Sequence, residues 1–328
     1  MRKRKYKKMI KIVSITLLVL ALLTSIIGYF IGNYFYNLAL NPTTDKSTVL
    51  EAPQNKSGIT TNEVAQQWFN SSKYKDIYIT ARDQLRLHAY QINQPVKSNN
   101  WVIICHGYAG KASSMQNAAK HFYDQGYEVL MPDARGHGQS DGKYIGMGWD
   151  ERLDMIDWIH QITTRNPQVN IVLYGVSMGA STVLMTSGEN LPKQVKTIIE
   201  DCGYTSVRDI FTYQLKSLFN LPGYPILDFA NVVTQIRAGY NIDNASAIKQ
   251  VKKSKTPTLF IHGDEDTFVP STMVYQLYNS ATVPKELFIV KGANHAKAAD
   301  IAKEEYWKKV FQFIGKFIDD KVAKRERI

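Results

Sequence analysis

The chain has 328 residues, of which 44% are hydrophobic and 21% are charged, and its formal net charge is +11 at pH 7. This length accommodates one large catalytic domain with a tail, or two small domains. The positive charge could indicate a nucleic-acid partner, but seven basic residues lie within the first eleven positions. A basic cluster beside an apolar run is a membrane-topology signal, and we therefore expect no nucleic-acid binding.

An apolar run of twenty residues without a charge, Ile12–Ile31, follows the basic cluster. As a helix it would be about 30 Å long, the thickness of the hydrocarbon layer of a bilayer. A cleaved signal peptide is the alternative, although its apolar region is usually about 7–15 residues long and ends at a small-residue site. We expect residues 1–36 to be a cytoplasmic basic tail and an uncleaved transmembrane anchor. The catalytic part would then lie on the extracellular side of the cell membrane.

Residues 37–72 are rich in Asn, Thr, Ser and Lys and are expected to form a linker, with a short helix over residues 62–69. Beyond the linker, apolar runs of strand length alternate with segments of helical periodicity. The eight predicted strands cover residues 76–80, 85–92, 101–105, 127–132, 171–175, 195–200, 257–263 and 286–290. This alternation predicts an α/β domain over residues 73–328, with a mostly parallel eight-stranded sheet and helices on both faces.

The segment Gly175–Gly179 reads GVSMG and points to a nucleophilic serine. A match to Gly-x-Ser-x-Gly alone is weak, because roughly one chain in ten of this length would contain it by chance. Here the motif follows a predicted buried strand and opens a helix rich in small residues. That context is typical of a nucleophile elbow, in which the serine occupies a sharp and strained turn. We therefore predict that Ser177 is the nucleophile.

A serine hydroxyl needs a base that removes its proton during attack, and His295 is the expected base. It follows the last predicted strand, where a loop can return its ring to the carboxyl edge of the sheet. Five other histidines have structural explanations. They lie inside or at the end of predicted strands, in predicted helices, or in a loop that a histidine would hold by hydrogen bonds. These structural histidines are His88, His121, His137, His160 and His262.

The acid that orients the base is expected in the segment HGDEDTFVP, residues 262–270, because this segment also follows a strand. Asp264 and Asp266 compete for the role. We favour Asp266, which lies further into the loop and can reach over to His295. Asp201, which follows an earlier strand, is the alternative.

Six stretches of the chain together resemble the α/β-hydrolase superfamily, in particular its bacterial branch of membrane-associated or cell-surface serine hydrolases. They are CHGYAG, PDARGHGQSDG, GVSMG, IIEDCGY, IHGDEDTFVP and GANHA, in that order. The chain order Ser177, Asp266, His295 is also that of the superfamily. The family pattern places the acid at Asp266, and it often has glycine after the histidine, where this chain has Ala296.

The resemblance implies an α/β-hydrolase fold and an oxyanion hole. The backbone N–H groups of Tyr108 and Met178 would point at the developing negative oxygen, each contributing about 3–4 kcal/mol of transition-state stabilisation. The ring of Tyr108 could line the acyl pocket or serve only as a structural aromatic.

Nearly sixty residues separate the predicted strands that end at residue 200 and begin at residue 258, too many for one crossover. We expect a small helical cap over about residues 203–250. Its first helix carries Phe211, Leu215 and Phe219 at helical spacing, and these side chains are candidates to line the substrate pocket. The alternative is that this face only packs on the sheet.

The expected function is hydrolysis of a small-molecule carboxylic ester through an acyl-enzyme. An acyltransferase or a peptidase acting through the same three residues is an alternative, as is a catalytically inactive exported binding protein. No metal-ligand spacing or phosphate loop is visible, so neither a metal nor a cofactor is expected. Cys105 and Cys202 should be free, because a strand is expected to separate them. Removal of residues 1–36 is expected to leave a soluble, active enzyme.

Overall fold

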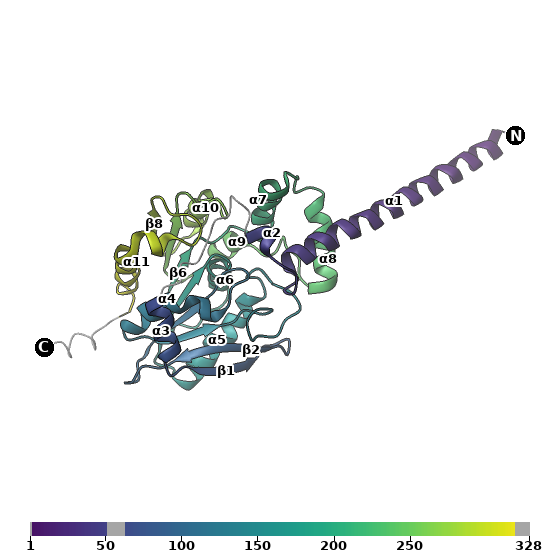
Figure 1. Cartoon of the computed structure of the whole chain (residues 1–328). Coiled ribbons are helices and arrows are strands. Elements are labelled where there is room, and N and C mark those ends of the chain that lie inside the picture. The colour runs from purple at the N-terminus through teal and green to yellow at the C-terminus, as the bar shows by residue number, and fades with distance from the viewer. Residues whose placement is uncertain (1, 51–62, 319–328) are drawn as a thin grey trace.

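The computed structural model describes residues 2–50 and 63–318 and is built around one eight-stranded sheet (Figure 1). The strand order is β1-β2-β4-β3-β5-β6-β7-β8, with β1 and β2 antiparallel to their neighbours and the other strands parallel. The strands are β1 Lys75–Thr80, β2 Arg86–Ile92, β3 Asn100–Cys105, β4 Glu128–Pro132, β5 Asn170–Val176, β6 Val195–Asp201, β7 Thr258–Gly263 and β8 Lys285–Val290. The predicted fold class, an eight-stranded and mostly parallel α/β sheet, is confirmed.

Helices connect the strands and cover both faces of the sheet (Figure 1). They are α1 Arg2–Leu40, α2 Ser47–Leu50, α3 Glu63–Ser71, the 3₁₀ turn η2 Ala112–Met115, α4 Gln116–Asp124, α5 Glu151–Arg165, α6 Met178–Ser187, α7 Val207–Phe219, α8 Ile226–Ala238, α9 Ala247–Val251, α10 Thr272–Ser280 and α11 Ala298–Ile314. The apolar run of β3 is continuous because side chains on both faces of this strand are buried. Val102 and Ile104 pack into the core formed with α4 and α11, whereas Ile103 packs into the core formed with α5 and α6.

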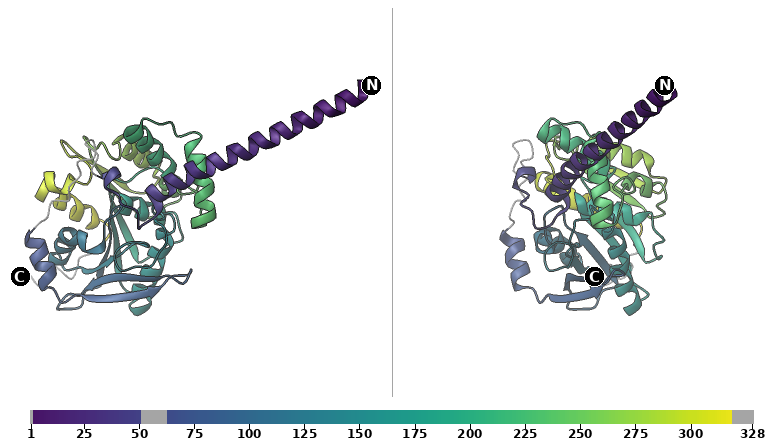
Figure 2. Two further views of the ribbon diagram at one scale, coloured as in Figure 1. Left: turned by 45° about the vertical axis from the view of Figure 1, so that its right-hand side comes forward. Right: turned by 90° about the vertical axis from the view of Figure 1, so that its right-hand side faces the viewer.

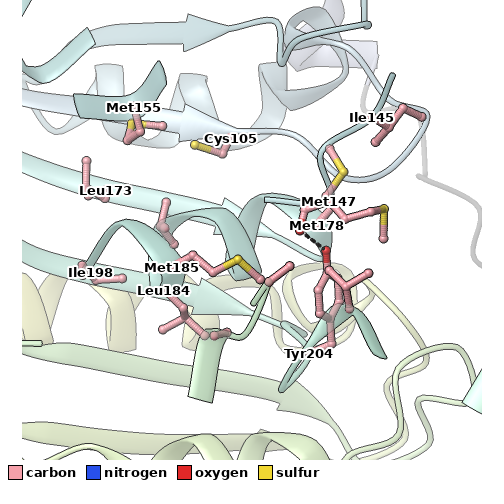
Figure 3. Close-up of a cluster of buried hydrophobic side chains, with 14 of the residues drawn as sticks. Cys105, Ile145, Met147, Met155, Leu173, Met178, Leu184, Met185, Ile198 and Tyr204 are labelled. Atoms are coloured by element: carbon pink, nitrogen blue, oxygen red, sulfur yellow. Dashed lines mark hydrogen bonds between the residues drawn. The ribbon is translucent and has the colours of Figure 1, made fainter. Parts of the chain in front are cut away.

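The helix that follows the GVSMG turn, α6, is buried along its whole length. Figure 3 shows the apolar cluster around it, which includes Met147, Met178 and Met185. The hydroxyl of Tyr204 donates to the carbonyl oxygen of Met147 at 2.9 Å within this cluster, so its buried polar group has a partner (Figure 3). Dense packing on every side fixes the position of α6 and therefore of the residue before it.

The first helix, α1, is long and apolar enough to cross a membrane, and its N-terminal half projects away from the domain with exposed side chains (Figures 1 and 2). It does not end at residue 36, where we expected the anchor to give way to a linker. It continues to Leu40, and Tyr36 and Leu40 are only 2% and 1% exposed. Residues 37–50 therefore pack into the domain through α1 and α2. Residues 51–62 of the expected linker lie outside the described residues.

This packing changes the expected effect of truncation. Tyr36 and Leu40 belong to the same apolar core as α6, and Phe35 packs against it. Removal of residues 1–36 would expose the surface that Phe35 and Tyr36 cover on the domain, which is the physical reason why a cut at this point is a poor division between anchor and enzyme.

The segment between β6 and β7 forms the expected helical cap, with α7 and α8 as its main elements. Helix α7 begins at an N-cap serine, Ser206, whose hydroxyl accepts from the Asp209 N–H at 3.0 Å. It ends where Asn220 adopts a left-handed conformation. Helix α8 lies beside α1 in both views of Figure 2.

Candidate active site

The three predicted catalytic residues and Tyr108 come from four separate loops at the carboxyl edge of the sheet. Tyr108 follows β3, Ser177 lies between β5 and α6, Asp266 follows β7, and His295 follows β8. In open α/β sheets this edge is where ligands bind, because the loops of parallel strands converge there.

Ser177 occupies a strained turn, with φ of 58° and ψ of −117°. This conformation is rare for a residue with a side chain and costs on the order of 1–3 kcal/mol. The flanking glycines explain how the turn fits. A Cβ on Gly175 would lie 2.2 Å from the carbonyl oxygen of Gly179, and a Cβ on Gly179 would lie 2.2 Å from that of Cys105. The turn therefore presses directly on the neighbouring strand, and it directs the serine hydroxyl away from the sheet.

The three predicted catalytic side chains form one hydrogen-bonded chain. The Oγ atom of Ser177 lies 2.8 Å from Nε2 of His295, and Nδ1 of His295 lies 2.7 Å from Oδ2 of Asp266. The other carboxylate oxygen of Asp266 accepts from the backbone N–H groups of Phe268 and Val269, at 2.9 and 2.8 Å. An ionised Asp266 can only accept, so Nδ1 of His295 carries the proton and Nε2 is free to accept from Ser177.

The electrostatics keep Asp266 ionised. Burial acts to raise the pKa of Asp266, but the charge of His295 and hydrogen bonds from His262 and His295 outweigh it, so the pKa lies well below its usual range. His262 supports the same loop from β7, since its Nε2 lies 2.9 Å from the Val269 carbonyl oxygen and 3.2 Å from Oδ2 of Asp266. Its position agrees with the structural role that its place at a strand end suggests.

The two competing carboxylates point elsewhere. Asp264 accepts from the backbone N–H of Gly292 at 2.6 Å. Asp201 accepts from the hydroxyl of Tyr306 at 2.8 Å, and burial raises the pKa of its carboxyl to about 6. Among the three candidates, the carboxylate hydrogen-bonded to His295 is that of Asp266.

A residue that the sequence analysis did not assign, His106, fixes the loop that carries Tyr108. Its Nε2 accepts from the Ala134 N–H at 3.0 Å, which leaves Nδ1 as the donor to the Gly107 carbonyl oxygen at 2.8 Å. The Gly110 N–H donates to the same oxygen at 3.0 Å. The C=O and N–H of one peptide plane point in opposite directions, so holding the Gly107 carbonyl also fixes the direction of the Tyr108 N–H.

The loop lies against the nucleophile, since a Cβ on Gly107 would be 3.4 Å from Cβ of Ser177. The signal for His106 was present in the motif CHGYAG, directly before the residue expected to form the oxyanion hole. Burial lowers the pKa of His106, so the ring is neutral and can donate and accept at the same time.

An apolar cavity opens beside Ser177 and is bordered by all four side chains predicted to bind substrate. These are Tyr108, Phe211, Leu215 and Phe219. Residues of α1 border the same cavity, which the sequence did not suggest. The hydroxyl of Tyr108 donates to the carbonyl oxygen of Ala39 at 2.7 Å, so the Tyr108 side chain is tied to the end of α1.

A second cavity shares Tyr108 and Ser177 with the first and is lined by residues of α4 and α11. Its lining includes polar side chains, among them Ser114, Asn117 and His295. Two spaces therefore meet at the serine hydroxyl, one lined almost entirely by apolar groups and one whose mainly apolar lining also carries polar side chains.

One group of possible metal ligands lies at this site. Ligand atoms of Cys202, Asp266 and His295 come within 4.8 Å of one another. Burial raises the pKa of the Cys202 thiol well above its usual value, and a neutral thiol is a poor ligand. Both ring nitrogens of His295 also have partners already. Cys105 and Cys202 are free and buried, as expected.

The residue after His295 has an unusual backbone conformation. Ala296 has φ of +56°, in the left-handed region that favours glycine. This geometry is a physical reason for glycine to occur after the histidine in related sequences. The alanine is accommodated here at a cost of roughly 1–2 kcal/mol.

Comparisons with known proteins agree with the fold. A family model described as serine aminopeptidase, S33, matches residues 96–218. The uncharacterised protein YqkD of Bacillus subtilis is 29% identical over 226 residues, which cover 69% of this chain and 74% of the relative. The α/β-hydrolase domain-containing protein WAV2 of Arabidopsis thaliana is 26% identical over 261 residues, covering 76% of this chain and 80% of WAV2.

Among solved structures, the esterase Pf2001 of Pyrococcus furiosus is similar, with a TM-score of 0.62 and 25% identity. The match covers 75% of this chain and 94% of the esterase. The sheet topology and these similarities agree with one another. The chain has the α/β-hydrolase fold, and these similarities support its placement in the α/β-hydrolase superfamily.

Proposed function

We propose that this protein is a serine hydrolase that cleaves a carboxylic ester through an acyl-enzyme intermediate. The observation that carries the proposal is the hydrogen-bonded chain from Ser177 through His295 to Asp266, with the serine on a strained turn. An activated serine needs a base within hydrogen-bond reach and a third group that orients the base, and the described residues supply both.

The reaction follows from this geometry. Ser177 Oγ attacks the ester carbonyl carbon while its proton moves to Nε2 of His295, and Asp266 stabilises the resulting imidazolium. Backbone N–H groups of Tyr108 and Met178 would bind the oxyanion. The bond to the alcohol oxygen then breaks, and His295 donates its proton to the leaving alcohol. Water, deprotonated by the same nitrogen, attacks the acyl-enzyme and releases the acid and the free serine.

Several observations support an ester substrate over a peptide. The cavity beside Ser177 is lined mainly by apolar side chains, which suits an acyl group. The match to the esterase Pf2001, at 25% identity, covers 94% of that esterase. The family model that matches residues 96–218 is named for an aminopeptidase, so a peptide substrate is the alternative to test.

Helix α1 would anchor the enzyme in the membrane, with the basic N-terminus on the cytoplasmic side.

A fluorophosphonate probe tests the proposal on the full chain in detergent. We expect the probe to label the wild type and the Ser271→Ala variant, but not Ser177→Ala. Ser271 is a matched control, since it is the N-cap residue just before α10 and its side chain makes no capping hydrogen bond.

The wild type and Ser271→Ala should hydrolyse p-nitrophenyl butyrate faster than an amino-acid p-nitroanilide, and Ser177→Ala should hydrolyse neither. An unlabelled but folded wild type would favour an inactive binding protein. Faster cleavage of the anilide would favour a peptidase.

A further inference from the structure

Helix α1 is docked tightly onto the cap. A Cβ on Gly28 would lie 2.6 Å from the ring of Phe229, and a Cβ on Gly32 would lie 2.4 Å from the Phe229 carbonyl oxygen. Two glycines four positions apart let α1 and α8 approach closely, as small residues do between membrane helices. The cap therefore sits against the last turns of the apolar run.

Polar contacts hold the same interface further along both helices. Arg237 of α8 donates to the side-chain oxygens of Asn33 and Asn37 of α1, at 2.7 and 2.9 Å. Its guanidinium also lies 4.2 Å from the ring centre of Tyr36. These directional contacts set the rotation of α1 about its axis, and thereby determine which of its side chains face the domain.

The side chains that face the domain complete the apolar cavity beside Ser177. Phe35, Leu38 and Ala39 of α1 border it together with residues of α7. The rings of Phe35 and Phe219 meet edge to face, with centroids 5.8 Å apart. The end of α1 is therefore one wall of the space in which an acyl group would lie.

The cap also exposes large apolar side chains on and beside α8. Tyr224, just before α8, is 80% exposed, and Val232 and Ile236 of α8 are 55% and 72% exposed. Single exposed apolar residues are ordinary. Val232 and Ile236 belong to α8, which packs on α1 near the end of its apolar run (Figures 1 and 2), and Tyr224 lies just before α8. A membrane crossed by this run would end near α8.

We propose that the substrate is a membrane lipid carrying a long fatty acyl ester, and that the end of the anchor helix forms one wall of its acyl site. The proposal rests on the ester hydrolase function proposed above. The acyl chain would pass from the bilayer beside α8 into the cavity between α1 and α7, with its carbonyl carbon at Ser177. The polar alcohol would occupy the second cavity, between α4 and α11. Water cleaves the ester, and a fatty acid and the lipid alcohol are released.

The first test measures chain-length preference with the full chain in mixed micelles. The quantity is the ratio of kcat/KM for p-nitrophenyl palmitate to that for p-nitrophenyl acetate. We expect the wild type to favour palmitate, and Ala39→Phe, which fills the α1 side of the cavity, to lower the ratio on the order of tenfold or more. The matched control is Ala21→Phe, the same change on an exposed part of α1, and it should keep the wild-type ratio.

A second variant and a vesicle assay complete the test. If Ala39→Phe is not labelled by the fluorophosphonate, Phe35→Ala, which removes part of the same wall, must lower the ratio instead. Vesicles of phosphatidylcholine and phosphatidylglycerol should release free fatty acid in the presence of the wild type but not of Ser177→Ala.

The two proposals fail differently. Loss of labelling and of acetate hydrolysis in the wild type would overturn the ester hydrolase itself. Normal acetate hydrolysis would support the ester hydrolase. The lipid proposal alone would then be overturned if the wild type showed no preference for palmitate, if Ala39→Phe and Ala21→Phe had equal effects, or if vesicles released no fatty acid.

Discussion

The substitution Asp266→Asn separates the orienting role of the carboxylate from its part in holding the loop. The asparagine side-chain oxygen can still accept from the N–H groups of Phe268 and Val269, so the loop should keep its shape. Its amide group would replace Oδ2, which lies 2.7 Å from Nδ1 of His295. An amide N–H there requires Nδ1 to accept, which moves the ring proton to Nε2 and removes the base from Ser177.

The expected loss is about 10⁴-fold in kcat, which corresponds to about 5.4 kcal/mol of transition-state stabilisation. KM for p-nitrophenyl butyrate should change little, because Asp266 faces His295 and its own loop. Asp201→Asn and Asp264→Asn are matched controls, and each should retain kcat within about tenfold. Thermal unfolding of all three variants checks that they fold. The reasoning is refuted if Asp266→Asn stays within tenfold of the wild type, or if either control loses as much activity.

Three further predictions concern His106, Glu200 and Ala296. His106→Phe removes the donor that holds the Gly107 carbonyl, so kcat should fall roughly 10–100-fold at nearly constant KM, and an unchanged kcat would contradict a positioning role. Burial raises the pKa of Glu200 to about 8, so the stability that this group contributes is fully present below its unfolded pKa and is lost as the pH rises through about 8. Denaturant titrations should therefore show Glu200→Gln gaining roughly 1–3 kcal/mol over the wild type between about pH 5 and pH 8, and a pH-independent difference would count against it. Ala296 has positive φ, so Ala296→Gly should keep kcat within about twofold while Ala296→Val lowers the free energy of unfolding by more than about 1 kcal/mol.

The docking of α1 changes how the anchor should be viewed. A flexible tether would leave the active site independent of the membrane helix. Instead, the hydroxyl of Tyr108 donates to the carbonyl oxygen of Ala39, and the Lys46 ammonium donates to the carbonyl oxygens of Leu38 and Asn41, at 2.8 and 2.7 Å. These contacts satisfy carbonyl groups at the C-terminal end of the helix and connect them to the loop beside Ser177. Soluble fragments should therefore be designed to retain the last turns of α1.

The candidate site could be predicted from the sequence to the extent that local pattern determines it. The GVSMG motif predicted the strand, the turn and the helix around Ser177, because its glycines are needed wherever that turn presses on the sheet. The loops of His295 and Asp266 follow strands, so their meeting at one edge followed from the parallel topology. The choice between Asp264 and Asp266 was less secure, because two residues of one loop differ only in where their side chains point.

The tertiary structure decided what depends on contacts between distant segments. The motif CHGYAG contains His106, but only the structure shows the hydrogen bond through which His106 fixes a neighbouring peptide plane. The sequence predicts an anchor over residues 1–36, and the structure shows that the same helix continues to Leu40, which is buried in the domain. The pattern of apolar residues records which residues avoid water, and so it predicted the sheet, the cap helix and the apolar first helix. It does not record which apolar surfaces meet, and only the fold shows that α1 and α7 enclose one cavity beside Ser177.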